Sequence, residues 1–250
     1  MRRPLILISN DDGFRAEGIQ VAAKALSTVG QVVVVAPEGE QSATSHSLTL
    51  HRPLRIRRQS PHLYSVDGTP TDCILLAVHE ILKRRPDLVV SGINHGPNLG
   101  DDVHYSGTVS AALEGALMGI RSVAFSLVLW QDRRPLWPVA SLYARRLSRW
   151  ILNGGVPDGA VFNVNIPNVR RVCGVEMTRL GKRNYGEVII KKRDPRGRDY
   201  FWIGGDEKGL EREARSDCNA ILDKKVSVTP LIIDLTNHSF LRGTDSWTLP

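Results

Sequence analysis

Two adjacent carboxylates, Asp11 and Asp12, stand directly after a short apolar run and directly before a glycine. An Asn-Asp-Asp-Gly string taken alone is more often a tight turn or a helix cap, because these residues favour bends and bond to nearby backbone N–H groups. Two close carboxylates also repel each other unless a cation lies between them. The functional interpretation is therefore a site for a hard metal ion. Neighbouring side chains on a strand point to opposite faces, so both serve one site only if the chain already turns, as Gly13 permits.

Two further oxygen-bearing side chains follow later apolar runs. Ser42 comes after the run at residues 31–36, and Asn94 comes after the run at residues 87–91. Each of them alone is an ordinary loop or turn residue. Together with the aspartate pair, however, hydroxyl and carboxamide oxygens suit Mg²⁺ or Mn²⁺ better than zinc or copper. We expect these four side chains to bind one divalent ion per subunit.

The string Tyr105-Ser106-Gly107-Thr108 stands immediately before an alanine-rich helical run. The free backbone N–H groups and the dipole of a helix start form an anion site, to which the hydroxyls of Ser106 and Thr108 can add donors. A plain helix cap needs only Ser106, whereas Gly107 suggests that a ligand approaches the backbone closely. Asn98, in a nearby glycine-rich loop, is a candidate donor to the same anion. We expect a phosphate site here.

A sheet is needed to bring these residues together. Strands are predicted at Leu5–Ser9, 31–36, 87–91 and Ser122–Val128, and helices at 17–29, 70–83, 106–118 and 136–152. Strands that are apolar throughout and alternate with helices indicate a parallel sheet with helices on both faces. Ligands of such sheets bind at the carboxyl ends of the strands. The sequence therefore predicts a Rossmann-like α/β body with the candidate site at that edge.

The second half of the chain has a different pattern. Further strands are predicted at 160–166, 175–180 and Val226–Leu231, and a hairpin at 187–192 and Asp199–Ile203 around the turn at 194–197. Residues 204–217 are polar and highly charged, so we expect an exposed loop there. We divide the chain into a body of residues 1–180 that carries the site and a C-terminal extension of residues 181–250. Arms of this kind serve in contacts between protomers, including exchange of segments.

The composition is that of a soluble globular protein, with 42% hydrophobic and 24% charged residues. No apolar run is long enough to span a bilayer. The first residues lack the longer apolar core and the small-residue cleavage site of a signal peptide. We therefore expect a cytoplasmic protein that makes no membrane contact. The three cysteines have no Cys-x-x-Cys spacing, which argues against a disulfide framework and a zinc site, and His46 and His95 are isolated.

The net charge of +7 fits nucleic acid, an anionic substrate or no specific partner. The densest basic segments, 52–58 and 191–193, are typical of a solvated strand face. No motif that reads nucleic acid is recognisable, so we expect no stable nucleic-acid complex. The chain also lacks the Gly-x-x-x-x-Gly-Lys-Ser/Thr loop, the Gly-x-Gly-x-x-Gly fingerprint and the Gly-x-Ser-x-Gly elbow. Their absence disfavours an ATPase, a nicotinamide enzyme and an esterase.

Taken together, these strings resemble the family of SurE-type survival-protein 5′-nucleotidases. The matching segments are residues 9–13, 41–42, 47–50, 68–73, 91–94, 96–102, 105–109, 194–197, 216–217, 228–231 and 234–236, with His238. They extend over nearly the whole chain, and several of them are long and specific. One departure is the stretch 204–218, which is richer in charge than the corresponding family loop and bears on base preference.

The resemblance implies a Rossmann-like body with an extended C-terminal arm, and dimers or tetramers with exchanged C-terminal segments. The implied activity is hydrolysis of nucleoside 5′-monophosphates to nucleoside and phosphate, with short polyphosphate as a second substrate. The metal ligands of the family map onto Asp11, Asp12, Ser42 and Asn94, and its phosphate contacts onto Asn98, Ser106, Gly107 and Thr108.

Two points about the chemistry stay open at this level. With Asp11 and Asp12 as the catalytic residues, either a metal-activated water or an aspartate attacks phosphorus, the latter through an aspartyl-phosphate. A different class of function, a nucleotide-binding regulator without turnover, fits the same residues.

Overall fold

The computed structural model describes residues 2–129, 134–183, 189–203 and 209–241. The first half contains β1 (Leu5–Ser9), α1 (Glu17–Leu26), β2 (Gln31–Pro37), β3 (Ile56–Ser60), β4 (Leu63–Val66), α2 (Pro70–Leu76), the π-helical turn η1 (Ala77–Ile81), β5 (Leu88–His95), the 3₁₀ turn η2 (Gly100–His104), α3 (Gly107–Leu117) and β6 (Ser122–Val128). The second half contains α4 (Trp137–Asn153), β7 (Val161–Pro167), β8 (Val175–Met177), β9 (Ile189–Arg193), β10 (Asp199–Ile203), α5 (Asp217–Leu222), β11 (Val226–Leu231) and α6 (His238–Leu241).

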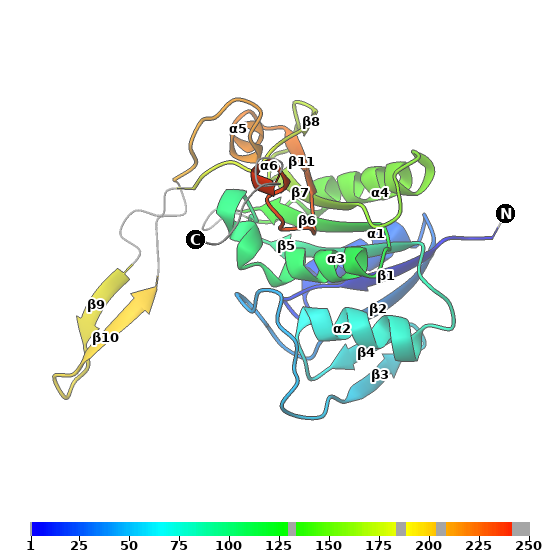
Figure 1. Ribbon diagram of the computed structural model, residues 1–250, viewed down its shortest axis with the longest axis horizontal. Coiled ribbons are helices and arrows are strands. Elements are labelled where there is room, and N and C mark those ends of the chain that lie inside the picture. The colour runs from blue at the N-terminus through cyan, green and yellow to red at the C-terminus, as the bar shows by residue number, and fades with distance from the viewer. Residues whose placement is uncertain (1, 130–133, 184–188, 204–208, 242–250) are drawn as a thin grey trace, which may run out of the picture.

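One sheet of nine strands forms the body, in the order β3-β4-β2-β1-β5-β6-β7-β11-β8 (Figure 1). The strands from β4 to β7 in this order are parallel, as the sequence predicts. The sheet is nevertheless mixed rather than wholly parallel. β3 runs antiparallel to β4 because only a short turn joins them, and β11 of the C-terminal extension lies antiparallel to β7 and parallel to β8.

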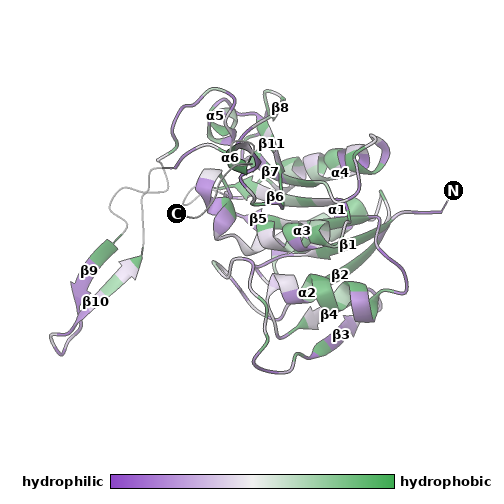
Figure 2. Ribbon diagram, in the orientation of Figure 1, coloured by the Kyte–Doolittle hydropathy of each residue, from purple (hydrophilic) through white to green (hydrophobic). Residues whose placement is uncertain are grey.

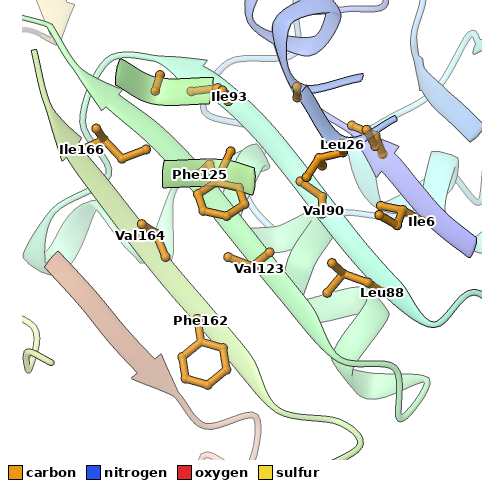
Figure 3. Packing of buried hydrophobic residues seen from close by; sticks show 14 of the residues in the cluster. Ile6, Leu26, Leu88, Val90, Ile93, Val123, Phe125, Phe162, Val164 and Ile166 are labelled. Atoms are coloured by element: carbon orange, nitrogen blue, oxygen red, sulfur yellow. The ribbon is translucent and has the colours of Figure 1, made fainter. Parts of the chain in front are cut away.

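Helices cover both faces of the sheet. α1 and α4 pack on one face, around a core that includes Ile6, Val90 and Phe125 (Figure 3). α2 and α3 pack on the other face, against side chains such as Leu7 and Val89. Successive strand residues point to opposite faces, so a strand that is covered on both sides must be apolar throughout. The predicted α/β fold is confirmed, with its carboxyl strand ends at one edge.

Several predicted elements have different ends. The helix expected at 17–29 ends at Leu26, and the strand expected at 175–180 ends at Met177. The helix expected at 70–83 is α-helical only to Leu76, and η1 continues it to Ile81. Its predicted start is confirmed, because Thr69 caps the N–H of Asp72 while the Asp72 carboxylate accepts from the N–H of Thr69.

The chain after residue 180 contains the antiparallel hairpin β9–β10, which stands away from the body (Figure 1). Its residues are exposed, and hydrophobic positions lie among the charged ones (Figure 2). Residues 187 and 188 of the predicted first strand, and residues 204–208 of the predicted loop, lie outside the described residues. The rest of that loop is largely exposed, but its end is not: Ser216 and Asp217 are buried, and α5 begins there because Ser216 caps it.

Part of the basic surplus lies at the ends of helices. Arg3 donates to the carbonyl of Ser27 after α1, Arg85 to that of Met118 after α3, and Arg121 to that of Leu152 in the last turn of α4. Cations at helix C-termini satisfy unpaired carbonyls and complement the helix dipole. These arginines therefore have a structural role that requires no nucleic acid. No helix among the described residues has both the length and the apolar character needed to cross a membrane.

Candidate active site

The turn after β1 is held by residues other than the aspartate pair. The side-chain amide of Asn10 donates to the carbonyl of Gly13 at 2.9 Å, and Gly13 takes a φ of 93°. The first residue before α1 is Ala16, and no side chain caps this helix. Asp11 and Asp12 thus neither close the turn with their side chains nor cap the helix. The interpretation of the pair as a structural turn or cap leaves both carboxylates unexplained.

Asp11 is buried against the start of α3. The hydroxyl of Thr108 donates to Asp11 Oδ1, and a Cβ on Gly107 would lie 2.8 Å from Asp11 Cβ. The backbone carbonyl of Asp11 accepts from the N–H of Gln41 at 2.8 Å. The end of β1, the loop after β2 and the first turn of α3 therefore meet at Asp11, as the convergence of parallel strand ends predicts.

The electrostatics of the pair favour a bound cation. Burial raises the pKa of Asp11, although the hydrogen bond from Thr108 opposes this. Burial and the charge of Asp11 raise the pKa of Asp12 to about 6. The backbone N–H of His95 stabilises the charged form and so opposes this rise. Glu40 also raises the pKa of both carboxylates. A divalent ion between them would relieve this repulsion and restore the charge lost to burial.

The two other candidate ligands lie on the neighbouring strand ends. Ser42 is exposed on the loop after β2, and its hydroxyl donates to Glu40 Oε1 at 2.7 Å. Asn94 lies near the end of β5, where its amide N–H donates to the carbonyl of Gly96 at 3.1 Å. Among the described residues, no group of three or more His, Cys, Asp or Glu side chains could hold a metal. The available donors are therefore carboxylate, hydroxyl and carboxamide oxygens, a set that fits a hard divalent ion.

Glu40 is a charged neighbour of the site that sequence reasoning missed. The signal was present, since Glu40 lies in the polar segment that follows β2, two residues before Ser42. His46, which looked isolated, also has a partner: its Nε2 lies 2.7 Å from Oε2 of Glu114 on α3. The loop that carries Ser42 is thus attached to α3.

The phosphate candidates surround the start of α3. Ser106 caps the helix, and its Oγ accepts from the N–H of Val109 at 3.1 Å. The hydroxyl of Thr108 thus donates to Asp11, whereas that of Ser106 only accepts and can still donate to an anion. With the N–H of Val109 occupied, those of Gly107 and Thr108, which lack intrahelical acceptors, are the natural anion donors, and the N–H of Thr108 also stabilises the Asp11 carboxylate. The structure brings Ser106, Gly107 and Thr108 to one place beside the aspartate pair.

Asn98 is fixed by a buried polar network. Its N–H donates to Asn165 Oδ1 at 2.9 Å, and its amide donates to Ser126 Oγ at 2.7 Å. The backbone carbonyl of Asn98 accepts from the side-chain amides of Asn163 and Asn165. Sequence reasoning missed these partners, although two asparagines in the otherwise apolar strand β7 were a usable signal, because buried polar groups need partners.

Fold and site together define an α/β protein with an oxygen-lined acidic centre beside a helix N-terminus, at the carboxyl edge of a largely parallel sheet. The family model described as "Survival protein SurE" matches residues 6–187. This chain belongs to the SurE family.

Relatives match over nearly their whole lengths. A protein of Pelobacter propionicus named "5′-nucleotidase SurE" is 48% identical over 248 residues, which cover 97% of this chain and 98% of that protein. A protein of Myxococcus xanthus with the same name is 49% identical over 244 residues, with 97% and 92% covered. The crystal structure of the SurE protein from Aquifex aeolicus superimposes with a TM-score of 0.87 at 43% identity, covering 96% of this chain and 98% of that one.

Proposed function

We propose that this protein is a 5′-nucleotidase that hydrolyses nucleoside 5′-monophosphates to nucleoside and phosphate in a metal-dependent reaction. The observation that carries the proposal is the hydrogen bond from Thr108 to Asp11, because it joins the acidic centre to the helix start that can bind phosphate. Relatives named 5′-nucleotidase that align with 97% of this chain support the same activity. Short polyphosphate is a second candidate substrate, since the anion site recognises phosphate and not the base.

Asp11, Asp12, Ser42 and Asn94 would hold one Mg²⁺ or Mn²⁺ ion per subunit. When bound, such an ion supplies a Lewis acid for the phosphoryl group and a water of lowered pKa. The support is the donor set and the raised pKa of both carboxylates, which burial and repulsion disfavour as anions without a cation.

The protein groups divide the remaining work. The N–H groups at the start of α3 hold phosphoryl oxygens and orient the ester for in-line attack. Asp11 is buried and receives the Thr108 hydroxyl, so its side chain is held in a fixed position against α3. Asp12 is less buried, so its carboxylate is the more accessible of the two to accept a proton from the attacking water. We therefore assign metal binding to both residues and proton transfer to Asp12.

Attack by water distinguishes this mechanism from an aspartyl-phosphate route. A single turnover of a ³²P-labelled monophosphate, quenched in acid during the reaction, tests it. An aspartate nucleophile displaces the nucleoside and leaves ³²P covalently on the protein until water hydrolyses the acyl phosphate, whereas direct attack by water leaves no ³²P on the protein at any time.

A substrate panel of nucleoside monophosphates and short polyphosphate, run with Mg²⁺, with Mn²⁺ and with chelated enzyme, tests the function itself. We expect phosphate release only with metal, and loss of release in Asp12→Asn and Asn94→Ala with the fold intact. Activity that survives chelation would refute the metal-dependent reaction. Tight binding of monophosphates without phosphate release would instead favour the alternative function, a nucleotide-binding regulator without turnover.

The hairpin β9–β10 supports a homo-oligomer. Phe201, Trp202 and Ile203 of β10 are 58%, 62% and 83% exposed. An isolated two-stranded hairpin is marginally stable in water, and an exposed apolar patch of this kind marks a contact surface. A second copy of the chain, in a dimer or tetramer with exchanged C-terminal segments, would cover it.

A further inference from the structure

The turn that leads to the phosphate site is attached to the base of the hairpin arm. η2 leads directly to Ser106 and the start of α3, so its position affects where these candidate phosphate contacts lie, whereas Asn98 on its other side is held by β6 and β7. On one side it is anchored by its own Asp102, which accepts from the N–H of Leu99 at 3.1 Å. On the other side it packs against chain segments near residues 181 and 217, which are remote in sequence.

Asp217 forms the centre of this attachment. Its side chain is fully buried, and its two carboxylate oxygens accept three backbone N–H groups: those of Gly100 at 2.9 Å, Gly181 at 2.8 Å and Cys218 at 2.7 Å. A buried carboxylate is costly unless such donors satisfy it. The Asp217 side chain therefore holds three segments together: η2, the chain segment that leads into the hairpin, and the start of α5.

The fit at this junction is close. Gly100 has a φ of 53°, and a Cβ there would lie 2.5 Å from the carbonyl oxygen of Gly181. Arg183 adds an ion pair with Asp102, in which the two side chains are only 7% and 12% exposed. The turn thus has little freedom to move independently of residues 181–183.

The same residues form the base of the arm. Arg183 and Leu210 form an isolated antiparallel β-bridge, and the N–H of Glu211 donates to the carbonyl of Lys182 at 3.2 Å. Residues 182–183 and 210–211, which lie on either side of the hairpin in the sequence, are therefore paired with each other. Asp217 lies further along the returning segment, where its N–H donates to the carbonyl of Arg179 at 2.9 Å.

We infer that Asp217 and Arg183 are positioning residues for the substrate phosphate: they fix η2, which leads to Ser106, from the base of the arm. Neither touches the aspartate pair in any described contact. Their loss should therefore weaken phosphate binding while leaving the metal ligands in place. This inference rests on the proposed function for its kinetic readout, although phosphate binding can be measured without turnover.

The test compares Asp217→Asn, Arg183→Lys and Arg183→Met in the full-length protein. Glu213→Gln is the matched control, since Glu213 lies on the same returning segment and pairs with Arg179 at 2.9 Å, away from the turn. The readouts are KM for adenosine 5′-monophosphate, the inhibition constant of inorganic phosphate, kcat, the affinity for Mn²⁺ and the melting temperature.

For Asp217→Asn we expect KM and the phosphate inhibition constant to rise together by about tenfold, because a displaced turn misplaces the phosphate contacts. Mn²⁺ affinity should stay unchanged, Arg183→Lys should retain more phosphate affinity than Arg183→Met, and the control should behave as wild type. Folded variants with unchanged KM and phosphate inhibition would overturn the inference, as would an equal loss of Mn²⁺ affinity.

Two further outcomes are distinguishable. If Asp217→Asn does not fold, the two Arg183 variants test the inference. Equal phosphate affinity in Arg183→Lys, Arg183→Met and the wild type would then overturn it. If the wild-type protein binds inorganic phosphate by calorimetry but releases none from any monophosphate, the proposed function fails. The comparison of phosphate affinities between variants and wild type then still tests the positioning role.

Discussion

The hydroxyl of Thr108 donates to Oδ1 of Asp11, across a separation of 97 residues in the sequence. The bond joins the first turn of α3 to the end of β1. Gly107 lies directly against the same aspartate, so no side chain intervenes between the helix start and the carboxylate. The part of the site suited to metal and the part suited to phosphate are therefore in direct contact.

Replacing Thr108 tests the importance of that bond. Thr108→Val keeps the shape but leaves the buried Asp11 carboxylate without this donor, which costs about 1.5–3 kcal/mol for a charged group. We expect kcat/KM to fall by roughly ten- to a hundredfold, while Thr108→Ser retains most activity because it keeps the hydroxyl. Equal kcat/KM in Thr108→Val and Thr108→Ser would show that the hydrogen bond to Asp11 does not contribute to catalysis.

Gly107→Ala tests the close approach of the helix to the acidic centre. The added Cβ would lie 2.8 Å from Asp11 Cβ, so the aspartate or the helix must shift. We expect a loss of metal affinity together with activity, measured by Mn²⁺ titration and phosphate release. Gly39→Ala is the control, because a Cβ there meets open space. Similar losses in both variants would contradict this explanation.

Asp12→Asn should separate stability from activity. The folded-state pKa of Asp12, about 6, lies above its ordinary value of 3.8. Without metal, this residue therefore costs the folded protein stability as pH rises from about 4 through 6. We expect the inactive Asn variant to be about 1 kcal/mol more stable than wild type at pH 8, since partial exposure reduces the full effect.

That gain corresponds to a rise of about 2–4 °C in melting temperature, to be measured in chelator. The difference should shrink as pH falls through the ordinary pKa of 3.8 and vanish about one unit below it, where the wild-type carboxyl is protonated in both states. Saturating Mn²⁺ should reverse the order, because the ion stabilises only the protein that binds it well. A variant that is less stable than wild type in chelator at pH 8 would argue against the raised pKa.

The arm is tested by removing its exposed apolar surface. In the double variant Phe201→Ser and Trp202→Ser we expect a smaller assembly by analytical ultracentrifugation, because the apolar burial that favours association is lost. Arg196→Ser, at the tip of the hairpin, is the control and should keep the wild-type assembly. Unchanged sedimentation of the double variant would exclude this surface from the interface.

Much of the fold follows from local patterns. The apolar runs at β1, β2, β5 and β6 predict buried strands, because side chains on both faces of a covered sheet must avoid water. Thr69 and Pro70 predict the start of α2, and Ser106 predicts that of α3, because caps and first-turn residues act within a few positions. The direction of β11 was not predictable, since strand pairing joins residues that are distant in sequence.

The candidate site, like the fold, is only partly predictable from the sequence. The sequence by itself determined which oxygen-bearing side chains follow the strands, and the parallel pattern determined that they share an edge. Only the tertiary structure decided that Thr108 bonds to Asp11, that His46 pairs with Glu114 and that Asp217 holds Gly100. Hydrogen bonds and the repulsion that raises the pKa of Asp12 depend on distances of a few ångströms, which chain order does not specify.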